Sequence, residues 1–70
     1  MPKFFFHLSD GSNRYTDRQG VSCRDQKTAV AYAQQIAKDF RTDGAYDGFY
    51  VEVRDEENNR VARIPVSVVH

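Results

Sequence analysis

The sequence predicts a small α+β domain, a two-layer sandwich in which one helix packs on one face of a small antiparallel sheet. The expected order of elements is β-hairpin, helix, β-hairpin. Three observations predict it: a short aromatic segment opens the chain, one segment with helical spacing lies in the middle, and two segments near the end alternate apolar and polar residues. A chain of 70 residues has room for one domain, residues 1–70, with a thin core.

The first hairpin begins with a strand at residues 3–9, KFFFHLS. Bulky aromatic residues favour a strand, and the turn-forming residues 10–13 end it. A weaker extended stretch follows at residues 14–16, and the chain then continues through residues 17–20 to Val21 and Cys23. We interpret this second stretch as the return arm of the hairpin.

The helix is the clearest predicted element. Asp25 is a good N-cap, because its carboxylate can accept hydrogen bonds from the free N–H groups of the first turn. Ser22, with Asp25 three residues later, is a rival start in the form of a capping box. Gly44 marks the end. The apolar residues with helical spacing are Ala29, Tyr32, Ala33, Ile36, Ala37 and Phe40. Because one face alone is apolar, the helix should lie on a sheet.

The second hairpin is predicted from alternation. Residues 48–54, GFYVEVR, alternate apolar and polar side chains, as a half-buried strand does. Residues 55–59 form a charged loop in which either asparagine can adopt the left-handed conformation. Residues 60–66 return as the last strand. Pro65 lacks an N–H donor, so it belongs on a sheet edge or near the end of the strand.

The alternation also predicts the two faces of the sheet. The side chains expected to face the helix are Phe4, Phe6, Leu8, Phe49, Val51, Val53 and Ile64. The opposite face would carry Phe5, His7, Tyr50, Glu52 and Arg54, with nothing in the chain to cover them. This second face is the candidate interaction surface, and its predicted partner is a second copy of the chain, as a homodimer, or another protein.

Charge and composition exclude several classes of function. Ten basic residues balance ten acidic ones, whereas a nucleic-acid binder of this size usually has a basic excess. No cluster of Lys and Arg suggests a membrane surface. The apolar opening is too short for a signal peptide or a membrane span. The single cysteine, Cys23, cannot form a disulfide within the chain, which fits a reducing compartment. We therefore expect a soluble, cytoplasmic protein.

The sequence resembles a family of short bacterial proteins known only as a domain of unknown function. The opening with two aromatics, His7 and Leu8 is the most specific shared feature. The features that carry the resemblance are Met1-Pro2-Lys3-Phe4-Phe5-Phe6-His7-Leu8, Asp10-Gly11, Asp17 with Gly20, Asp25 with Ala29 and Ala33, Val51-Glu52-Val53, Asp55-Glu56, Val61 and Pro65-Val66. The resemblance covers nearly the whole chain and implies the same fold and a cytoplasmic origin. It implies no activity and no catalytic residue.

No catalytic, cofactor or metal site is predicted from the residues. A metal site needs three or four converging ligands, and the sequence has one other histidine besides His7, the terminal His70. We interpret His7 as a sheet histidine with a structural hydrogen bond or an interface role, and Cys23 as a small apolar filler. The acidic loops lack the spacing of a calcium site, and the scattered glycines form no phosphate-binding motif. No small-molecule ligand is implied.

The function predicted from the sequence is a non-enzymatic protein-interaction or self-association module. Two other functions compete with it. Small tautomerases use an N-terminal proline as a general base, and Pro2 followed by an apolar strand is superficially similar to them. With Met1 attached, however, the Pro2 nitrogen is an amide. Alternatively, Phe5 and Tyr50 on an open sheet face could stack single-stranded RNA bases, with Lys3 or Arg54 near the phosphates. The zero net charge counts against that reading.

Overall fold

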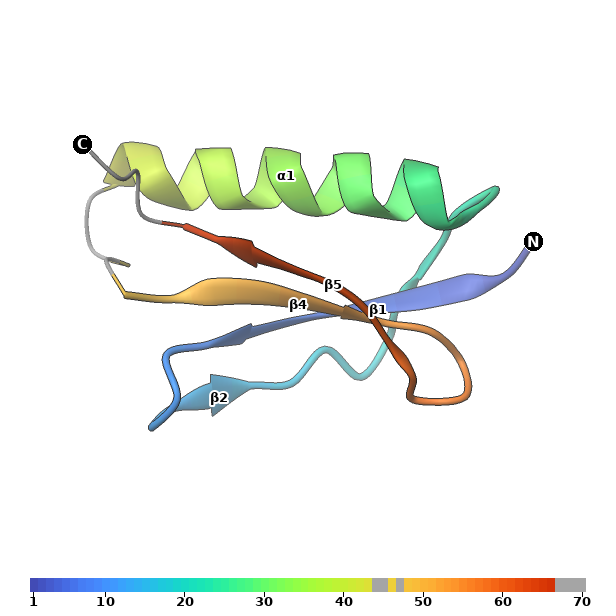
Figure 1. Cartoon of the computed structure of the whole chain (residues 1–70), viewed down its shortest axis with the longest axis horizontal. Coiled ribbons are helices and arrows are strands. Elements are labelled where there is room, and N and C mark those ends of the chain that lie inside the picture. Colours follow the sequence, from blue (N-terminus) through green and yellow to red (C-terminus); the bar gives the residue numbers. More distant parts are fainter. Residues whose placement is uncertain (44–45, 47, 67–70) are drawn as a thin grey trace.

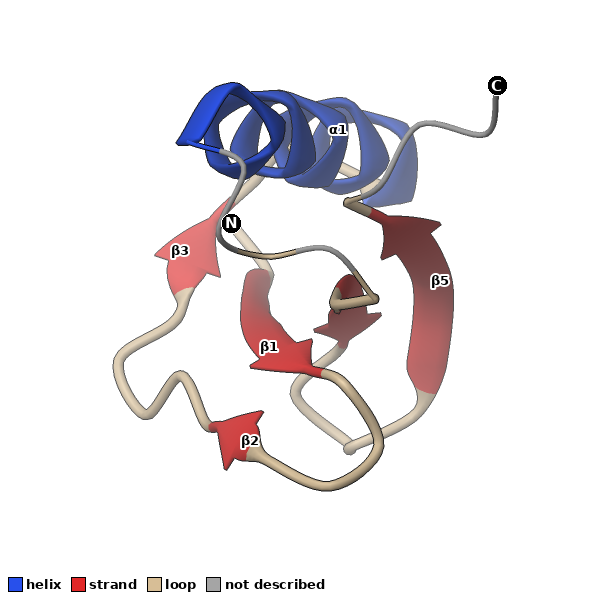
Figure 2. Cartoon of the chain, turned by 90° about the vertical axis from the view of Figure 1, so that its left-hand side faces the viewer, coloured by secondary structure: helices blue, strands red, loops and turns tan. Residues whose placement is uncertain are grey.

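The structure is a computed structural model that describes residues 1–43, 46 and 48–66, except for the side chain of Asp43. It confirms the predicted sandwich of hairpin, helix and hairpin, with one helix packed against an open antiparallel sheet (Figures 1 and 2). The elements are β1 (Lys3–Ser9), β2 (Arg14–Tyr15), β3 (Val21–Ser22), α1 (Gln26–Asp43), β4 (Tyr50–Arg54) and β5 (Arg60–Pro65). Among the described residues, no helix combines the length and the hydropathy needed to cross a membrane.

The sheet has the strand order β2-β1-β4-β5, and β3 pairs with the other end of the β1 edge that β2 occupies. Leu8 of β1 lies opposite Tyr15 of β2, and Phe4 lies opposite Val21 of β3. The return arm of the first hairpin is therefore two short strands with a loop between them. In Figure 2, β2 and β3 lie on one side of β1, and β5 lies on the other.

The helix begins at the predicted cap. The backbone N–H and the hydroxyl of Thr28 each donate a hydrogen bond of 2.8 Å to Asp25 Oδ1. Ser22, the rival start, instead pairs with Lys3 in the sheet. The predicted end at Gly44 lies outside the described residues. The Asp25 cap fixes where the chain leaves β3 and turns onto the sheet.

Three buried alanines form the face of α1 that meets the sheet. Ala29, Ala33 and Ala37 are fully buried, as are Val51 and Val53 of β4. Side chains this small allow the helix axis to approach the sheet closely, so no room remains for larger residues at these positions. The helix packs mainly against β4 and β5 (Figure 1). The helix-facing side of β1 is therefore covered less completely.

The predicted assignment of the faces is confirmed on the helix side. Phe4 is buried in the core, and Phe6 meets the helix through an edge-to-face contact with Tyr32, at 5.0 Å between ring centroids. Phe6 and Leu8 are only half-buried, because α1 packs over β4 and β5 and leaves β1 less covered.

The second hairpin closes through residues 55–59. Asn58 adopts the left-handed conformation, with φ at 67°, which confirms that one of the two asparagines takes it. The side chain of Asp55 holds the loop by accepting hydrogen bonds from the N–H groups of Glu57 and Asn59, both at 2.9 Å. Pro65 ends β5, the outermost strand of the described sheet, as predicted.

Candidate functional site

The sheet brings all five predicted surface residues together on the face opposite the helix, which we call the outer face. Phe5 lies opposite Arg54, His7 lies opposite Glu52, and Tyr50 lies one step further along, opposite Ser9. The expectation that nothing in the chain covers this face is wrong. His7 is only 6% exposed and Glu52 only 8%, and the other three residues are half-buried.

Part of the cover is the arm, which we define as residues 14–20. Its first two residues pair with β1 as strand β2. Beyond them, two hydrogen bonds of Asp17, which we call the His7–Asp17 pair, attach the arm to β1 at His7 and its neighbour Phe6. The backbone N–H of Asp17 donates to His7 Nδ1 at 3.0 Å, and the backbone N–H of Phe6 donates to Asp17 Oδ2 at 3.2 Å. In the gap between β2 and β3, the backbone groups on this edge of β1 have no paired strand in the described sheet. The side chain of Asp17 lies there instead and accepts the hydrogen bond of the Phe6 N–H.

Asp17 also shapes the arm itself. Its Oδ1 accepts hydrogen bonds from the N–H groups of Gln19 and Gly20, both at 3.1 Å. Gly20 has a positive φ of 73°, and a Cβ atom there would lie 2.8 Å from Lys3 Cγ and 2.9 Å from Phe5 Cε2. Gly20 is therefore required twice, for the backbone conformation and for the close approach of the arm to β1.

Two arginines neutralise the buried carboxylate of Glu52. Arg54 donates to it through Nε at 3.1 Å and through Nη2 at 3.3 Å, and Arg14 Nη2 of the arm lies 3.3 Å from Oε1. Arg54 Nη1 also donates to the carbonyl oxygen of Asn58 at 2.7 Å. The hydrogen bond from Arg54 is the main reason that the pKa of Glu52 is lowered, despite the opposing effect of burial. Arg14 thereby fixes a second point of the arm.

The rings of the outer face are covered within the chain as well. The guanidinium of Arg63 lies over the ring of Tyr50, 3.9 Å from its centroid, in a cation–π contact. Gly20 packs against Phe5. Base stacking on this face would require both rings to be free, so the RNA-binding alternative gains no support from the geometry.

The pKa of His7 is lowered, which favours the neutral ring near neutral pH. Burial lowers its pKa from the ordinary value of 6.5, and the nearby positive charge of Arg14 lowers it further. The negative charges of Glu52 and Asp17 raise the pKa of His7, but by less than burial and the arginines lower it. Because Nδ1 accepts the Asp17 N–H, the neutral ring carries its proton on Nε2. The interpretation of His7 as a histidine with a structural hydrogen bond agrees with this geometry.

We call one set of polar contacts the outer-face network: those of His7, Asp17, Arg14, Glu52 and Arg54. Within the described part of the chain, every buried side-chain nitrogen or oxygen has a partner, and no three residues of the His, Cys, Asp and Glu types converge as metal ligands. Cys23 lies in the apolar core beneath the start of α1, away from this network. The arrangement serves to attach the arm to the sheet.

A second surface was not singled out from the sequence. It lies on the helix side of the sheet, where α1 leaves β1 and β2 less covered, and we call it the helix-side patch: Phe6, Leu8, Tyr15, Tyr32 and Phe49. Tyr15 is 60% exposed and Tyr32 is 43% exposed, and the other members are half-buried. Tyr15 stacks near Phe49 at 6.4 Å, and Tyr32 contacts Phe6. The residue that could have indicated this patch from the sequence is Tyr32, because it lies at the margin of the apolar face of the helix.

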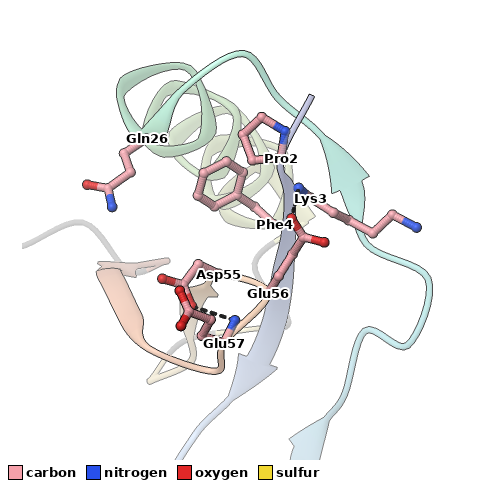
Figure 3. A pocket seen from close by; sticks show the side chains of 7 residues that line it. All are labelled: Pro2, Lys3, Phe4, Gln26, Asp55, Glu56 and Glu57. Atoms are coloured by element: carbon pink, nitrogen blue, oxygen red, sulfur yellow. Dashed lines mark hydrogen bonds between the residues drawn. The ribbon is translucent and has the colours of Figure 1, made fainter.

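A pocket of about 300 Å³ lies at the end of the molecule where β1 begins. It is lined by Pro2, Lys3, Phe4, Gln26, Asp55, Glu56 and Glu57. Figure 3 shows Pro2 and Phe4 on one side and the carboxylates of Asp55 and Glu57 on the other, with the Glu56 carboxylate beside the backbone of Lys3. Carboxylates would favour the protonated form of a free proline amine, whereas a general base must be unprotonated. The pocket therefore does not favour the tautomerase alternative.

Comparison with known proteins identifies the family. A family model described as a domain of unknown function (DUF6894) matches residues 3–67. The chain belongs to this family. No curated protein and no solved structure matches it.

In this DUF6894 chain, several of the features that prompted the resemblance meet at one place. His7 of the opening, Asp17 and Gly20 ahead of the helix, and Glu52 of the alternating strand all belong to the outer-face network or to the arm that covers it. Their roles here are hydrogen bonding, backbone conformation and charge neutralisation. This sequence pattern therefore specifies the attachment of the arm.

Proposed function

We propose that this DUF6894 chain is a non-enzymatic, self-associating interaction module that forms a two-fold dimer through the helix-side patch. One observation carries the proposal: Tyr15 and Tyr32 are strongly exposed on the same side of the sheet, above half-buried Phe6 and Leu8. Exposed aromatic side chains above half-buried apolar ones are typical of protein interfaces.

The size of the chain supports self-association. A single core in a chain below about 70–80 residues seldom supplies more than about 3–5 kcal/mol, and dimerisation is a common way to add stability. Here the core is built largely from small residues, with Ala29, Ala33 and Ala37 in the helix face. The cytoplasm is the proposed setting, since a free thiol such as that of Cys23 persists in a reducing compartment.

The net charge also suits a second copy of the same chain. Ten basic residues balance ten acidic ones, so two copies would not repel each other as they approach. In a two-fold arrangement the same patch serves both copies, and the exposed rings of Tyr15 and Tyr32 in each copy are covered by the other.

Sedimentation equilibrium of the whole chain tests the proposal. We expect a dimer at micromolar concentrations, and we expect Tyr15→Glu or Tyr32→Glu to weaken it at least about tenfold, because a buried unpaired carboxylate opposes association. Ala31→Glu is the matched control, because Ala31 is exposed on the same helix but lies away from the patch. Circular dichroism should show that every variant retains its helix.

Tyr50→Glu separates this interface from the outer face that the sequence suggested. If Tyr50→Glu dissociates the dimer and Tyr15→Glu does not, the outer face is the interface and the helix-side patch is not. A wild-type chain that stays at monomer mass to hundreds of micromolar would end the dimer proposal and leave another protein as the partner.

A further inference from the structure

The outer face is closed by contacts that depend on protonation. The arm is attached to β1 by the His7–Asp17 pair, and that pair requires a lone pair on His7 Nδ1 and a negative charge on Asp17. Both conditions hold near neutral pH. Burial alone would raise the pKa of Asp17, but the hydrogen bonds from the N–H groups of Gly20, Phe6 and Gln19 outweigh it and leave the pKa lowered.

We infer that the arm is a pH-controlled cover, which closes the outer face while His7 is neutral and opens when His7 is protonated. A proton on Nδ1 turns the acceptor into a donor. It would then face the Asp17 N–H, another donor, across a contact of 3.0 Å. The inference does not depend on the proposed dimer, because the contact between His7 and Asp17 lies on the outer face, whereas Tyr15 of the helix-side patch is held by the pairing of β2 with β1.

The charges around His7 decide the direction of the effect. Arg14 of the arm and Arg54 of β4 oppose a positive charge on the ring, whereas Glu52 of β4 and Asp17 of the arm favour it. Burial also opposes the positive charge, and burial and the two arginines together lower the pKa of His7. A closed arm that disfavours the proton must, by linkage, be disfavoured by the proton.

Opening would expose a surface that the closed chain hides. Gly20 packs against Phe5, and Asp17 occupies the edge of β1 at Phe6. With residues 16–20 of the arm displaced and β2 still paired, the ring of Phe5 and the hydrogen-bonding groups of β1 between β2 and β3 become accessible. Of the candidate interaction surface that the sequence indicated, Phe5 and His7 would then become accessible only after acidification, whereas Tyr50 would stay under Arg63 of β5 and Arg54 would stay bound to Glu52.

Hydrogen exchange read by nuclear magnetic resonance tests the cover on the whole chain. Between about pH 7.5 and about pH 5, we expect the protection factors of the Asp17 and Phe6 amides to fall at least about tenfold. Those of Ala33 and Ala37 in the helix report global unfolding and should stay well above those of Asp17 and Phe6 at both pH values. The ring resonances of His7 should show the tautomer with the proton on Nε2 at the higher pH, and protonation at the lower.

Two substitutions assign the response to His7. His7→Gln should remove the pH dependence at the Asp17 amide, whatever its remaining protection. His70→Gln removes the other histidine of the sequence and should leave the response intact. Repeating the measurement in Tyr32→Glu, a substitution on α1 outside the arm, keeps it separate from dimerisation.

The inference fails if the Asp17 and Phe6 amides keep their protection while the ring resonances show His7 to be protonated. It also fails if the Asp17 and Phe6 amides are as strongly protected as those of Ala33 and Ala37 at the lower pH, because the arm would then open only when the whole chain unfolds. A His7 that is still neutral at about pH 5 would overturn it as well, because the cover would then have no trigger in this range.

Discussion

Gly20 is the single residue on which the position of the arm depends most directly. It combines a left-handed backbone with contacts that leave no space for a side chain, whereas Gly11 has a similar φ of 93° with nothing within 4 Å of an added Cβ. The two glycines therefore allow backbone strain to be separated from steric conflict.

We predict that Gly20→Ala lowers the free energy of unfolding by about 2–4 kcal/mol, from left-handed strain together with overpacking against Lys3 and Phe5. Gly11→Ala should cost only about 1–2 kcal/mol, because it adds strain alone. Urea titration measures both. Equal losses in the two variants would mean that the arm yields easily at Gly20 and is not tightly packed.

The lowered pKa of His7 also predicts how the global stability of the chain depends on pH. Its pKa is lower in the folded chain than its ordinary value of 6.5, so the unfolded chain binds more protons in the window between the two values. The free energy of unfolding should thus be highest above about pH 6.5, fall as the pH decreases through this window, and level off below the folded pKa. Urea titrations across this range should show the fall in the wild type and not in His7→Gln.

A second fall should follow in more acidic solution. The carboxylates with lowered pKa values, among them Asp17 and Glu52, stabilise the fold above their ordinary values of 3.8 and 4.5 and lose this contribution as they are protonated. His7→Gln should retain this acidic step. A single step that the substitution leaves unchanged would show that His7 contributes nothing to stability.

At the scale of elements, the contact between α1 and the sheet sets the tolerance of the core. We predict that Ala33→Leu destabilises the chain by about 1–3 kcal/mol, because Ala33 is fully buried against the sheet and a larger side chain must force the layers apart. Ala31→Leu adds the same atoms on the exposed side of the same helix and should change stability by less than about 0.5 kcal/mol. Thermal or urea unfolding compares them, and equal effects would contradict the close approach of helix and sheet.

The elements themselves were largely predictable from local patterns. The Asp25 cap, the helical spacing, the alternation in β4 and the turn residues before and after each strand act over a few residues, so the sequence shows them directly. The arm was not predictable in the same way. Its position depends on hydrogen bonds between His7, Asp17 and Phe6, which lie ten or eleven residues apart and form no periodic pattern. The Asp17 and Gly20 pair was the available sign of a shaped turn.

At the scale of the whole molecule, the covering of the sheet decides which surface is free. A helix about 10–12 Å wide cannot cover strands spaced at about 4.8 Å across the full sheet, so some apolar surface had to remain. The sequence suggested that the larger uncovered area lay opposite the helix. The structure shows instead that the arm closes much of that face, and that Tyr15 and Tyr32 remain exposed on the helix side.

The strand β5 has a consequence for how the molecule behaves at high concentration. It is the outermost strand of the described sheet, and an open strand edge can recruit strands from other molecules and extend into filaments. Here that edge ends in Pro65, which lacks a donor, and carries Arg60 and Arg63, which are exposed. Like charges and a missing donor discourage edge-to-edge growth. Crowded solutions of this chain should therefore remain free of fibrils, even though more than a third of its residues are apolar.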